Sequence, residues 1–368
     1  MEVAWIIKSM PEKKFSTTLL SWNLIDNKRQ MPWKGETDPY KIWLSEIILQ
    51  QTRVEQGLKY YERFISAFPT IKHLANAKDE QVYKLWEGLG YYSRCKNLLL
   101  TARIIEQDYM GVFPDSYSQI LSLKGIGPYT AAAISSFAFN LPFAVVDGNV
   151  FRVLARIFGI SVPVDTQSGK ELFAGLASRL LDKKMPGIYN QAIMDFGALI
   201  CKPLNPRCEV CPFKNNCIAF NKNKINALPV KSKKAVIKKR WFSYFIIRYN
   251  GLVAIEKRTK KDIWQNLNQF YLIETKTALN KKQLVHEFKK QPCLKEAAFT
   301  IENISGLFEQ KLTHQLICGR FVEVYCQVKP SLPKTMKWAN NSEVNQLAFP
   351  SFINKYLQQR IAKTQPQL

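Results

Sequence analysis

The sequence predicts a multidomain protein, in which an all-α domain with a cysteine-rich loop is followed by a smaller α+β domain. Apolar residues recur at helical spacing from about residue 15 to residue 200, and four cysteines follow closely. Beyond residue 240, apolar and polar residues alternate as they do in β-strands. The chain has 368 residues, 46% of them hydrophobic, and is long enough for more than one core.

The charge of the chain predicts a polyanionic partner. There are 53 Lys and Arg against 29 Asp and Glu, a formal net charge of +24. Nucleic acid and an anionic membrane both fit that charge, but no apolar run reaches the roughly 18 to 20 residues that span a bilayer. The first eight residues are too short and too interrupted for a signal peptide. We therefore expect a cytoplasmic protein that does not enter a membrane.

The first two helices are expected at 15–27 and about 38–54, where apolar residues follow helical spacing. The second helix carries Glu46 among apolar neighbours, and burial there favours a protonated carboxyl. A structural account, in which Glu46 pairs with Arg53 or a backbone amide, is the usual explanation for one such residue. Further helices end at Gly88 and Gly90 and resume at 98–105. The segment between them, 90–94, is aromatic and basic and by itself only weakly indicates base stacking.

A glycine turn at 123–127 precedes the next helix. Gly125 and Gly127 allow a tight bend, and Pro128 suits a first helical turn, so the helix start is a candidate phosphate site. Farther on, Asp147 stands between apolar residues and Gly148. Burying a carboxylate there costs free energy, which indicates that Asp147 has a functional role. The simpler interpretation is a plain turn between packed helices, with Asp147 as an N-cap.

Four cysteines follow a helical segment at 168–200. Their spacings are six, two and five residues, and four thiolates this close repel one another unless a metal centre neutralises them. The spacing matches neither ferredoxin pattern, and no nearby histidine indicates a mixed zinc finger, so a cluster and a structural zinc both remain open. The ligand set is Cys201, Cys208, Cys211 and Cys217, whereas Cys95, Cys293, Cys318 and Cys326 are expected as reduced packing residues.

Composition changes after the cysteines. Residues 221–240 are strongly basic and are expected to form a linker that also touches DNA. Residues 241–249 and 252–257 are expected as two strands joined by an Asn250-Gly251 hairpin turn, and residues 321–328 alternate as a further strand.

These pieces together resemble a known family. The stretch 123–127, the segment Val146-Asp147-Gly148-Asn149 and the cysteine spacing resemble the helix-hairpin-helix DNA glycosylases that carry a 4Fe-4S cluster. Within that group, residues 44–54 look like the adenine DNA glycosylase family, known as MutY. The resemblance covers residues 15–220 strongly and the C-terminal part more loosely. It implies a glycosylase domain at 1–220 with one 4Fe-4S cluster on the four cysteines, a linker at 221–240 and a Nudix-like domain at 241–360.

The resemblance also implies an activity. Endonuclease III and other strand-cutting relatives carry a lysine that forms a Schiff base where this chain has Tyr129. A monofunctional DNA N-glycosylase of base-excision repair is therefore expected. Its implied partner is double-stranded DNA in which adenine is mispaired with 8-oxoguanine or guanine. We expect a nucleoid-associated monomer, with repair proteins contacting the linker.

Cleavage of an N-glycosidic bond needs one acid for the departing base and one carboxylate for the positive sugar. The resemblance implies that Glu46 protonates adenine N7 and that Asp147 stays ionised, as electrostatic stabiliser or transient nucleophile, positioned by Tyr129 and Asn149. Because the base lies inside the stack, it must be flipped out. By the same resemblance, Gly125 and Gly127 contact DNA, Gln51 and Tyr91 are wedge residues, and Arg29, Met31, Trp33 and Gln191 line the adenine pocket.

The C-terminal domain resembles the module that recognises 8-oxoguanine in this family. It lacks the Glu-rich box of Nudix hydrolases, so binding without hydrolysis is expected. Leu312-Thr313-His314 looks like the family's Phe-Ser-His turn, with leucine in place of phenylalanine, which leaves Thr313 and His314 as DNA contacts. His314 is otherwise an ordinary solvated histidine. The segment 268–271 and Lys124 also depart from the family pattern.

Three alternatives stay open on the sequence. One is a relative that acts on thymine or uracil mispairs. Another is a DNA-binding protein without activity, against which the intact pair Glu46 and Asp147 counts. The third is a zinc protein.

Overall fold

The computed structural model describes residues 10–232, 237–291 and 298–364. Cys293, part of the basic segment and the first nine residues lie outside these ranges. The chain divides into two compact units. The first is Met1–Asn76 with Asn97–Lys233, and the second is Ala77–Lys96 with Lys234–Leu368. None of the helices in the described ranges combines the length and apolar character that crossing a bilayer requires.

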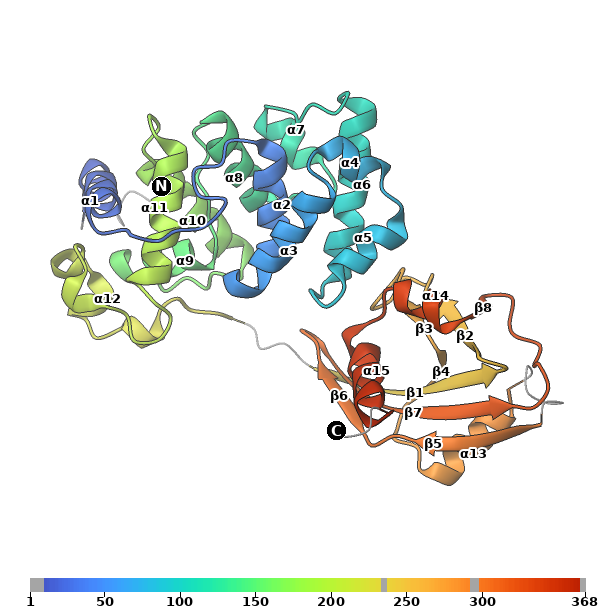
Figure 1. The fold of residues 1–368 in the computed structure, drawn as a ribbon. Coiled ribbons are helices and arrows are strands. Elements are labelled where there is room, and N and C mark those ends of the chain that lie inside the picture. The colour runs from blue at the N-terminus through green and yellow to red at the C-terminus, as the bar shows by residue number, and fades with distance from the viewer. Residues whose placement is uncertain (1–9, 233–236, 292–297, 365–368) are drawn as a thin grey trace. The chain divides into compact units, whose positions relative to one another are not determined.

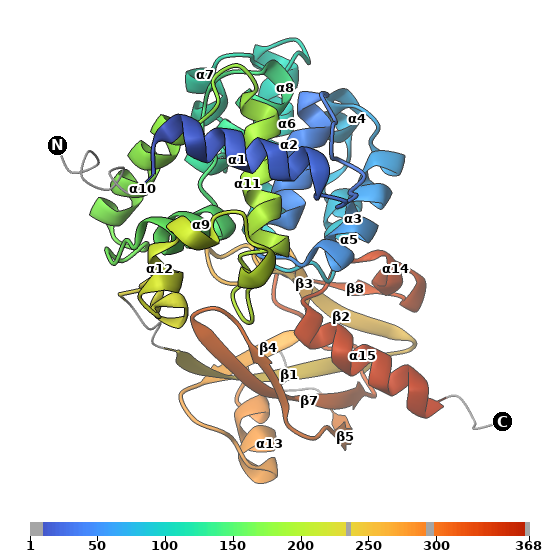
Figure 2. The same ribbon diagram turned by 90° about the vertical axis from the view of Figure 1, so that its left-hand side faces the viewer.

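The first unit is helical, as predicted. Its core surrounds α11, against which α1, α8 and α9 pack (Figures 1 and 2). Phe15, Phe196 and Phe213 are fully buried there, and the ring of Phe213 contacts those of Phe15 and Phe196. The helices are α1 (Glu12–Ile25), α2 (Pro39–Leu49), α3 (Val54–Ala67), α4 (Ile71–Asn76), most of α6 (Tyr92–Asp108), α7 (Tyr117–Ser122), α8 (Pro128–Phe139), α9 (Gly148–Phe158), α10 (Gln167–Leu180), α11 (Pro186–Leu199) and α12 (Ile218–Asn221).

The glycine turn joins α7 to α8. Gly125 has a φ of +77°, which favours glycine, and a Cβ there would lie 2.6 Å from that of Asn97. The Thr101 hydroxyl donates to the Lys124 carbonyl over 2.8 Å and fixes the turn from α6. Gly127 is the N-cap of α8 and has extended backbone, and a Cβ added there would meet no other residue within 4 Å. The tight turn is confirmed, with Gly125 as the residue whose backbone demands glycine.

The helix predicted at 38–54 is shorter than expected. It ends at Leu49, and α3 begins at Val54. Between them Gln51 has a φ of +56°, a left-handed conformation that interrupts helical hydrogen bonding. The loop expected at 90–94 is also shorter, because α6 already begins at Tyr92.

Part of the predicted linker packs on the helical unit. Leu228 is buried in the core of that unit, and the Val164 amide donates to the Val230 carbonyl over 3.0 Å. The role of residues 221–240 as a linker stays a prediction.

The second unit contains α5 (Asp79–Trp86) and a mixed sheet with the order β3-β2-β1-β7-β5. Its long central strands β1 and β7 run parallel. The predicted hairpin is confirmed, because Asn250 and Gly251 both have positive φ, as a type I′ turn requires. The strands are β1 (Lys238–Tyr249), β2 (Leu252–Lys257), β3 (Asn268–Gln269), β4 (Tyr271–Thr275), β5 (Phe299–Ile304), β6 (Phe308–Lys311), β7 (Gln315–Cys326) and β8 (Met336–Ala339).

Helices cover both faces of this sheet (Figure 1). On one face Phe288 of α13 (Lys281–Lys289) stacks on Phe245 of β1, with ring centroids 4.1 Å apart. On the other, Tyr356 of α15 (Ser351–Thr364) stacks on Phe321 of β7. A short helix, α14 (Asn341–Gln346), precedes α15. Residues 321–324 of β7 are consequently all buried, so the alternation in its sequence does not separate a solvated face from a buried one.

Candidate active site

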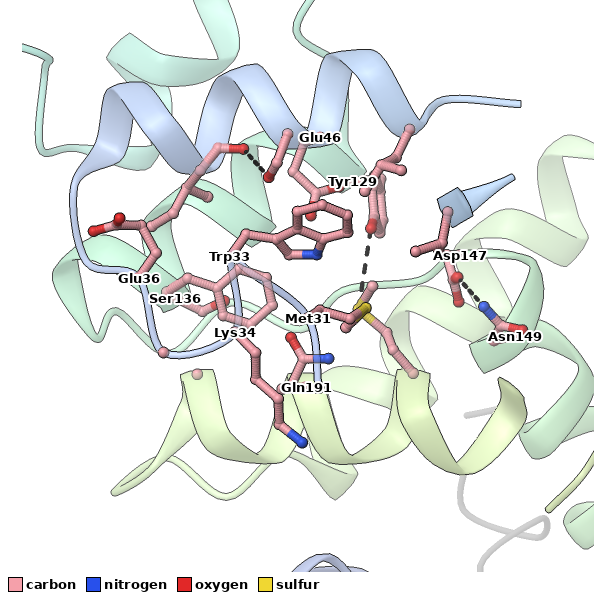
Figure 3. A pocket seen from close by; sticks show the side chains of 18 of the residues that line it. Met31, Trp33, Lys34, Glu36, Glu46, Tyr129, Ser136, Asp147, Asn149 and Gln191 are labelled. Atoms are coloured by element: carbon pink, nitrogen blue, oxygen red, sulfur yellow. Dashed lines mark hydrogen bonds between the residues drawn. The ribbon is translucent and has the colours of Figure 1, made fainter. Parts of the chain in front are cut away.

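A cavity of about 700 Å³ opens in the first unit, between α2, α8, α11 and the loop that follows α1. It collects side chains from segments far apart in the sequence (Figure 3). Every residue that the sequence assigned to catalysis or to the base pocket lines it, and so does one wedge candidate. These residues are Glu46, Tyr129, Asp147, Asn149, Arg29, Met31, Trp33, Gln191 and Gln51.

Glu46 is the buried acid of this cavity. It lies on α2 with 8% of its surface exposed, and desolvation raises its pKa to about 7. A hydrogen bond with the Tyr129 hydroxyl lowers that pKa, while the nearby charge of Asp147 raises it. Glu46 therefore faces Tyr129 and Asp147 rather than Arg53, and a carboxyl poised near neutrality is suited to proton transfer.

Asp147 is the N-cap of α9 and also faces the cavity. Its Oδ1 accepts from the Val150 amide over 2.8 Å, and its Oδ2 accepts from Asn149 Nδ2 over 2.7 Å. Desolvation raises the pKa of this carboxyl, and the hydrogen bonds from Val150 and Asn149 oppose that rise. Asp147 is therefore both a helix N-cap and a residue of the cavity. The two roles are compatible, because the cap holds the carboxylate at the positive end of a helix.

A buried arginine supports Asn149 from behind. Arg152 Nη2 donates to Asn149 Oδ1 over 2.8 Å, and its Nε donates to the Cys201 carbonyl over 2.7 Å. Gly197 allows the backbone of α11 to pass close to Asn149, since a Cβ at position 197 would lie 2.6 Å from the Cβ of Asn149. Asp147, Asn149 and Arg152 thus form a continuous chain to the start of the cysteine loop. Sequence reasoning missed Arg152, whose signal was a cation on an apolar helix.

Asn190 of α11 fixes the segment that leads to Asp147. Its Nδ2 donates to Ser136 Oγ and to the Phe143 carbonyl, over 2.9 Å and 2.8 Å. Its Oδ1 accepts from the Val145 amide over 3.2 Å. Asn190 is 1% exposed, and sequence reasoning did not single it out.

Asp195, also on α11, anchors the loop after α1. Its side chain is fully buried and forms ion pairs with Arg29 over 2.8 Å and Lys34 over 3.2 Å. The same carboxylate accepts from Asn27 and from Gln191. The loop is further braced by Trp33, whose ring meets that of Tyr61 edge-on. Asp195 was missed because its partners lie on a loop without periodicity.

The four predicted cysteines come together in one recess, which Arg156 and Lys214 also line. Arg156 Nη1 lies 3.6 Å from Cys201 Sγ. Burial, with Cys201, Cys217 and Cys208 nearby, raises the pKa of the Cys211 thiol to about 12. Thiolates so placed need a neutralising centre, and Cys₄ is the ligand set of 4Fe-4S clusters. In the described ranges, no group of three or more His, Cys, Asp or Glu residues has the arrangement of a metal-ion site.

Comparison with known proteins identifies the family. Residues 44–174 match the model of the HhH-GPD superfamily of base excision DNA repair proteins, and residues 243–359 match a NUDIX domain. The adenine DNA glycosylase of Buchnera aphidicola subsp. Schizaphis graminum is 40% identical over 264 residues, 71% of this chain and 76% of that protein. The chain belongs to the adenine DNA glycosylase family. It is therefore a DNA N-glycosylase of base-excision repair.

Other known proteins are also similar to this chain. The adenine DNA glycosylase of Homo sapiens is 40% identical over 215 residues, 56% of this chain and 39% of the human protein. Among solved structures, a thermostable thymine-DNA glycosylase is 31% identical with a TM-score of 0.54, covering 59% of this chain and 99% of its own. An endonuclease III–DNA complex, 19% identical with a TM-score of 0.50 over 58% of this chain and 98% of its own, shows the fold alone. The predicted helix-hairpin-helix domain followed by a Nudix-like domain is confirmed.

The remaining predicted DNA contacts of this adenine DNA glycosylase family member lie outside the cavity. Gly125 and Gly127 lie in the turn before α8. Within the second unit, Tyr91 has a φ of +49° and its hydroxyl lies 3.0 Å from Thr313 Oγ1. His314 is exposed beside it in the β6–β7 turn. Both wedge candidates, Gln51 and Tyr91, have a left-handed backbone, as do seven other non-glycine residues in the described ranges.

Proposed function

We propose that this enzyme removes adenine from double-stranded DNA in which adenine is mispaired with 8-oxoguanine or guanine, and that it leaves an abasic site without cutting the strand. The strongest support is that Glu46, from α2, and Asp147, from the start of α9, line the same cavity. The volume of about 700 Å³ lies in the range of small-molecule sites and accommodates a flipped nucleotide.

In the proposed mechanism Glu46 is the general acid. With a pKa of about 7, a large fraction of this carboxyl holds its proton at neutral pH. It transfers that proton to N7 of the flipped adenine, the C1′–N9 bond breaks, and the electron pair leaves with the neutral base. The bond to the Tyr129 hydroxyl orients the Glu46 carboxyl in the cavity.

Asp147 stabilises the other half of the reaction. Its carboxylate faces the positive charge that develops on the sugar, and the donors Val150 and Asn149 hold it in place. Water then adds to C1′ and loses a proton, which gives the abasic sugar.

The enzyme is proposed to be monofunctional because Tyr129 replaces the Schiff-base lysine of the strand-cutting relatives. A lysine does line the cavity, but Lys34 Nζ is bound to Asp195 and donates to the Arg29 carbonyl over 3.0 Å. A positively charged, hydrogen-bonded amine is a poor nucleophile.

We propose that Cys201, Cys208, Cys211 and Cys217 hold one 4Fe-4S cluster. When bound, the cluster neutralises the four thiolates and cross-links the loop. Arg156 closes the loop at both ends, since its guanidinium donates to the carbonyls of Lys202 and Pro203 on one side and of Ile225 and Leu228 on the other. Arg156 is 3% exposed, so these bonds form out of water.

The Nudix-like domain is proposed to recognise the base opposite adenine without hydrolysing a nucleotide. Thr313 and His314 are its candidate contacts, because both are exposed in the β6–β7 turn. Gly125 and Gly127 are proposed to meet phosphate at the start of α8, and residues 221–240 to add basic contacts to DNA or to repair proteins in the nucleoid.

A base-release assay on a panel of duplexes tests the function. Adenine opposite 8-oxoguanine, guanine, cytosine and thymine would be compared with thymine and uracil opposite guanine. Release of adenine from the first two duplexes is expected, with no strand cleavage until alkali is added. Preferential release of thymine, the substrate named for the solved thymine-DNA glycosylase, would contradict the proposal and favour that second function.

A further inference from the structure

We propose that Asp195 is a positioning residue for base selection, which turns the Gln191 amide so that its oxygen faces the cavity and accepts from the amino group of adenine. The inference rests on the proposed adenine excision and adds a residue that sets its specificity. Asp195 does not line the cavity, so its effect passes through the groups that it binds.

The Asp195 carboxylate acts as an acceptor at every contact. Oδ1 accepts from Arg29 Nη1 over 2.8 Å and from Gln191 Nε2 over 3.0 Å. Oδ2 accepts from Asn27 Nδ2 over 2.9 Å and pairs with Lys34 Nζ over 3.2 Å. Each carboxylate oxygen thus has two donors, and one donor of each pair, Arg29 or Lys34, is a cation. These four contacts satisfy a side chain that is 0% exposed. Because Asp195 accepts and never donates here, the amide of Gln191 has one favourable orientation toward it.

That orientation determines what Gln191 offers to a ligand. A glutamine amide carries one acceptor oxygen and one donor nitrogen, and its assignment follows from the surrounding hydrogen bonds. With Nε2 committed to Asp195, Oε1 accepts no hydrogen bond from any residue that the structure describes. Gln191 reaches from α11 into the cavity near Trp33 and Met31 (Figure 3). The cavity therefore gains a fixed acceptor on this side.

A fixed acceptor distinguishes purines by their substituent at C6. Adenine carries an amino donor there, whereas guanine and hypoxanthine carry a carbonyl oxygen. An amino group satisfies Gln191 Oε1, while a carbonyl sets two acceptors against each other and leaves both unpaired in a desolvated site. A reversed amide would favour the carbonyl, so the orientation that Asp195 imposes carries the preference.

Asp195 also holds the loop that follows α1. On this loop Arg29 and Lys34 flank Met31 and Trp33. Both cations form ion pairs with the Asp195 carboxylate. The Asn27 side chain, which Asp195 also binds, accepts from the Arg29 amide over 3.1 Å. One buried group thus sets the position of the loop and the direction of the Gln191 amide together.

The test compares two substrates under single-turnover conditions. Each duplex carries guanine opposite either adenine or unsubstituted purine, which lacks the amino group, and the ratio of the two rates is the readout. We expect Asp195→Asn to lower the adenine-to-purine ratio by roughly tenfold, because its amide can donate and permits Gln191 to turn. Gln191→Leu is expected to lower the ratio by a similar factor, and the double variant by no more than Gln191→Leu alone.

Several outcomes would overturn the assignment. If Asp195→Asn lowers the excision rates of adenine and purine by the same factor, Asp195 has only a general structural role. The same conclusion follows if the double variant lowers the adenine-to-purine ratio by the product of the two single effects. If Asp195→Asn fails to fold, Gln191→Leu alone decides, and an unchanged ratio contradicts the inference. Glu323→Gln, at a buried carboxylate of the second unit, is the matched control and must leave the ratio unchanged. A wild-type enzyme that releases no adenine would instead overturn the proposed function.

Discussion

The Asn149 side chain donates to Asp147 over 2.7 Å, and Arg152 in turn donates to Asn149 over 2.8 Å. The carboxylate at the start of α9 is therefore held by a chain of hydrogen bonds that leads to the buried Arg152, rather than by one partner. Glu46 stands on the same cavity with few donors and a raised pKa. Two carboxyl groups in unlike surroundings are suited to unlike roles, acid and charge stabiliser.

The pH dependence of excision is expected to be bell-shaped. Glu46 must keep its proton, so the single-turnover rate should fall as pH rises above about 7. Asp147 must be ionised, and because desolvation raises its pKa, the acid limb should lie above the usual pKa of an aspartate. Rates measured from pH 4 to pH 9 on one mispaired duplex check this. A rate that keeps increasing between pH 6 and pH 9 would assign the acid elsewhere.

Glu46 is expected to lower the stability of the fold at neutral and higher pH. Its pKa is raised from 4.5 to about 7, so the folded state holds the proton more tightly and stability falls as pH rises between these values. Above pH 7 the cost is about 3 kcal/mol. Glu46→Gln should therefore unfold at higher denaturant concentration than the wild type at pH 8, with a smaller difference at pH 4.5. Glu55→Gln, on the exposed surface of α3, corrects for the loss of one charge. An equal difference at both pH values would speak against the buried acid.

Borohydride is expected to trap no covalent complex with DNA. Tyr129 cannot form a Schiff base, and the Lys34 amine is engaged by Asp195 and the Arg29 carbonyl. Gel electrophoresis after borohydride treatment, with endonuclease III as the positive control, makes the measurement. A trapped adduct that disappears in Lys34→Gln would show that the enzyme is bifunctional and uses Lys34.

The purified protein is expected to be brown and to absorb in the visible range. Arg156→Gln should lose this absorption faster under a chelator, because the guanidinium binds the carbonyls at both ends of the cysteine loop. Arg207→Gln, at an exposed arginine of the same loop, is the control and should bleach at the wild-type rate. A colourless protein with one zinc ion would contradict the cluster.

Sequence patterns located much of this structure because they report burial. Glu46 and Asp147 stood out as carboxyl groups among apolar neighbours, and both line the cavity. The hairpin at Asn250 and Gly251 followed from the φ values that these residues tolerate. Such features are local, so a single sequence displays them.

Features that depend on distant partners were missed. Asp195 looks like any acidic residue on an apolar helix until the loop carrying Arg29 and Lys34 is placed against it. Strand β7 alternates in sequence, yet Val322 and Val324 share a core cluster with Phe288 of α13, and Phe321 stacks on Tyr356 of α15. Helix α2 ends at Leu49 because Gln51 turns left-handed, and periodicity does not report φ.

The most direct test of the central claim is the excision rate of Glu46→Gln on duplex DNA with adenine opposite 8-oxoguanine. The variant keeps the shape of the side chain but has no proton to transfer at neutral pH. We predict that it binds this duplex as the wild type does, and that adenine release falls by a factor of at least about 10²–10⁴. Adenine release near the wild-type rate would contradict the assignment of Glu46 as the acid and the mechanism built on it.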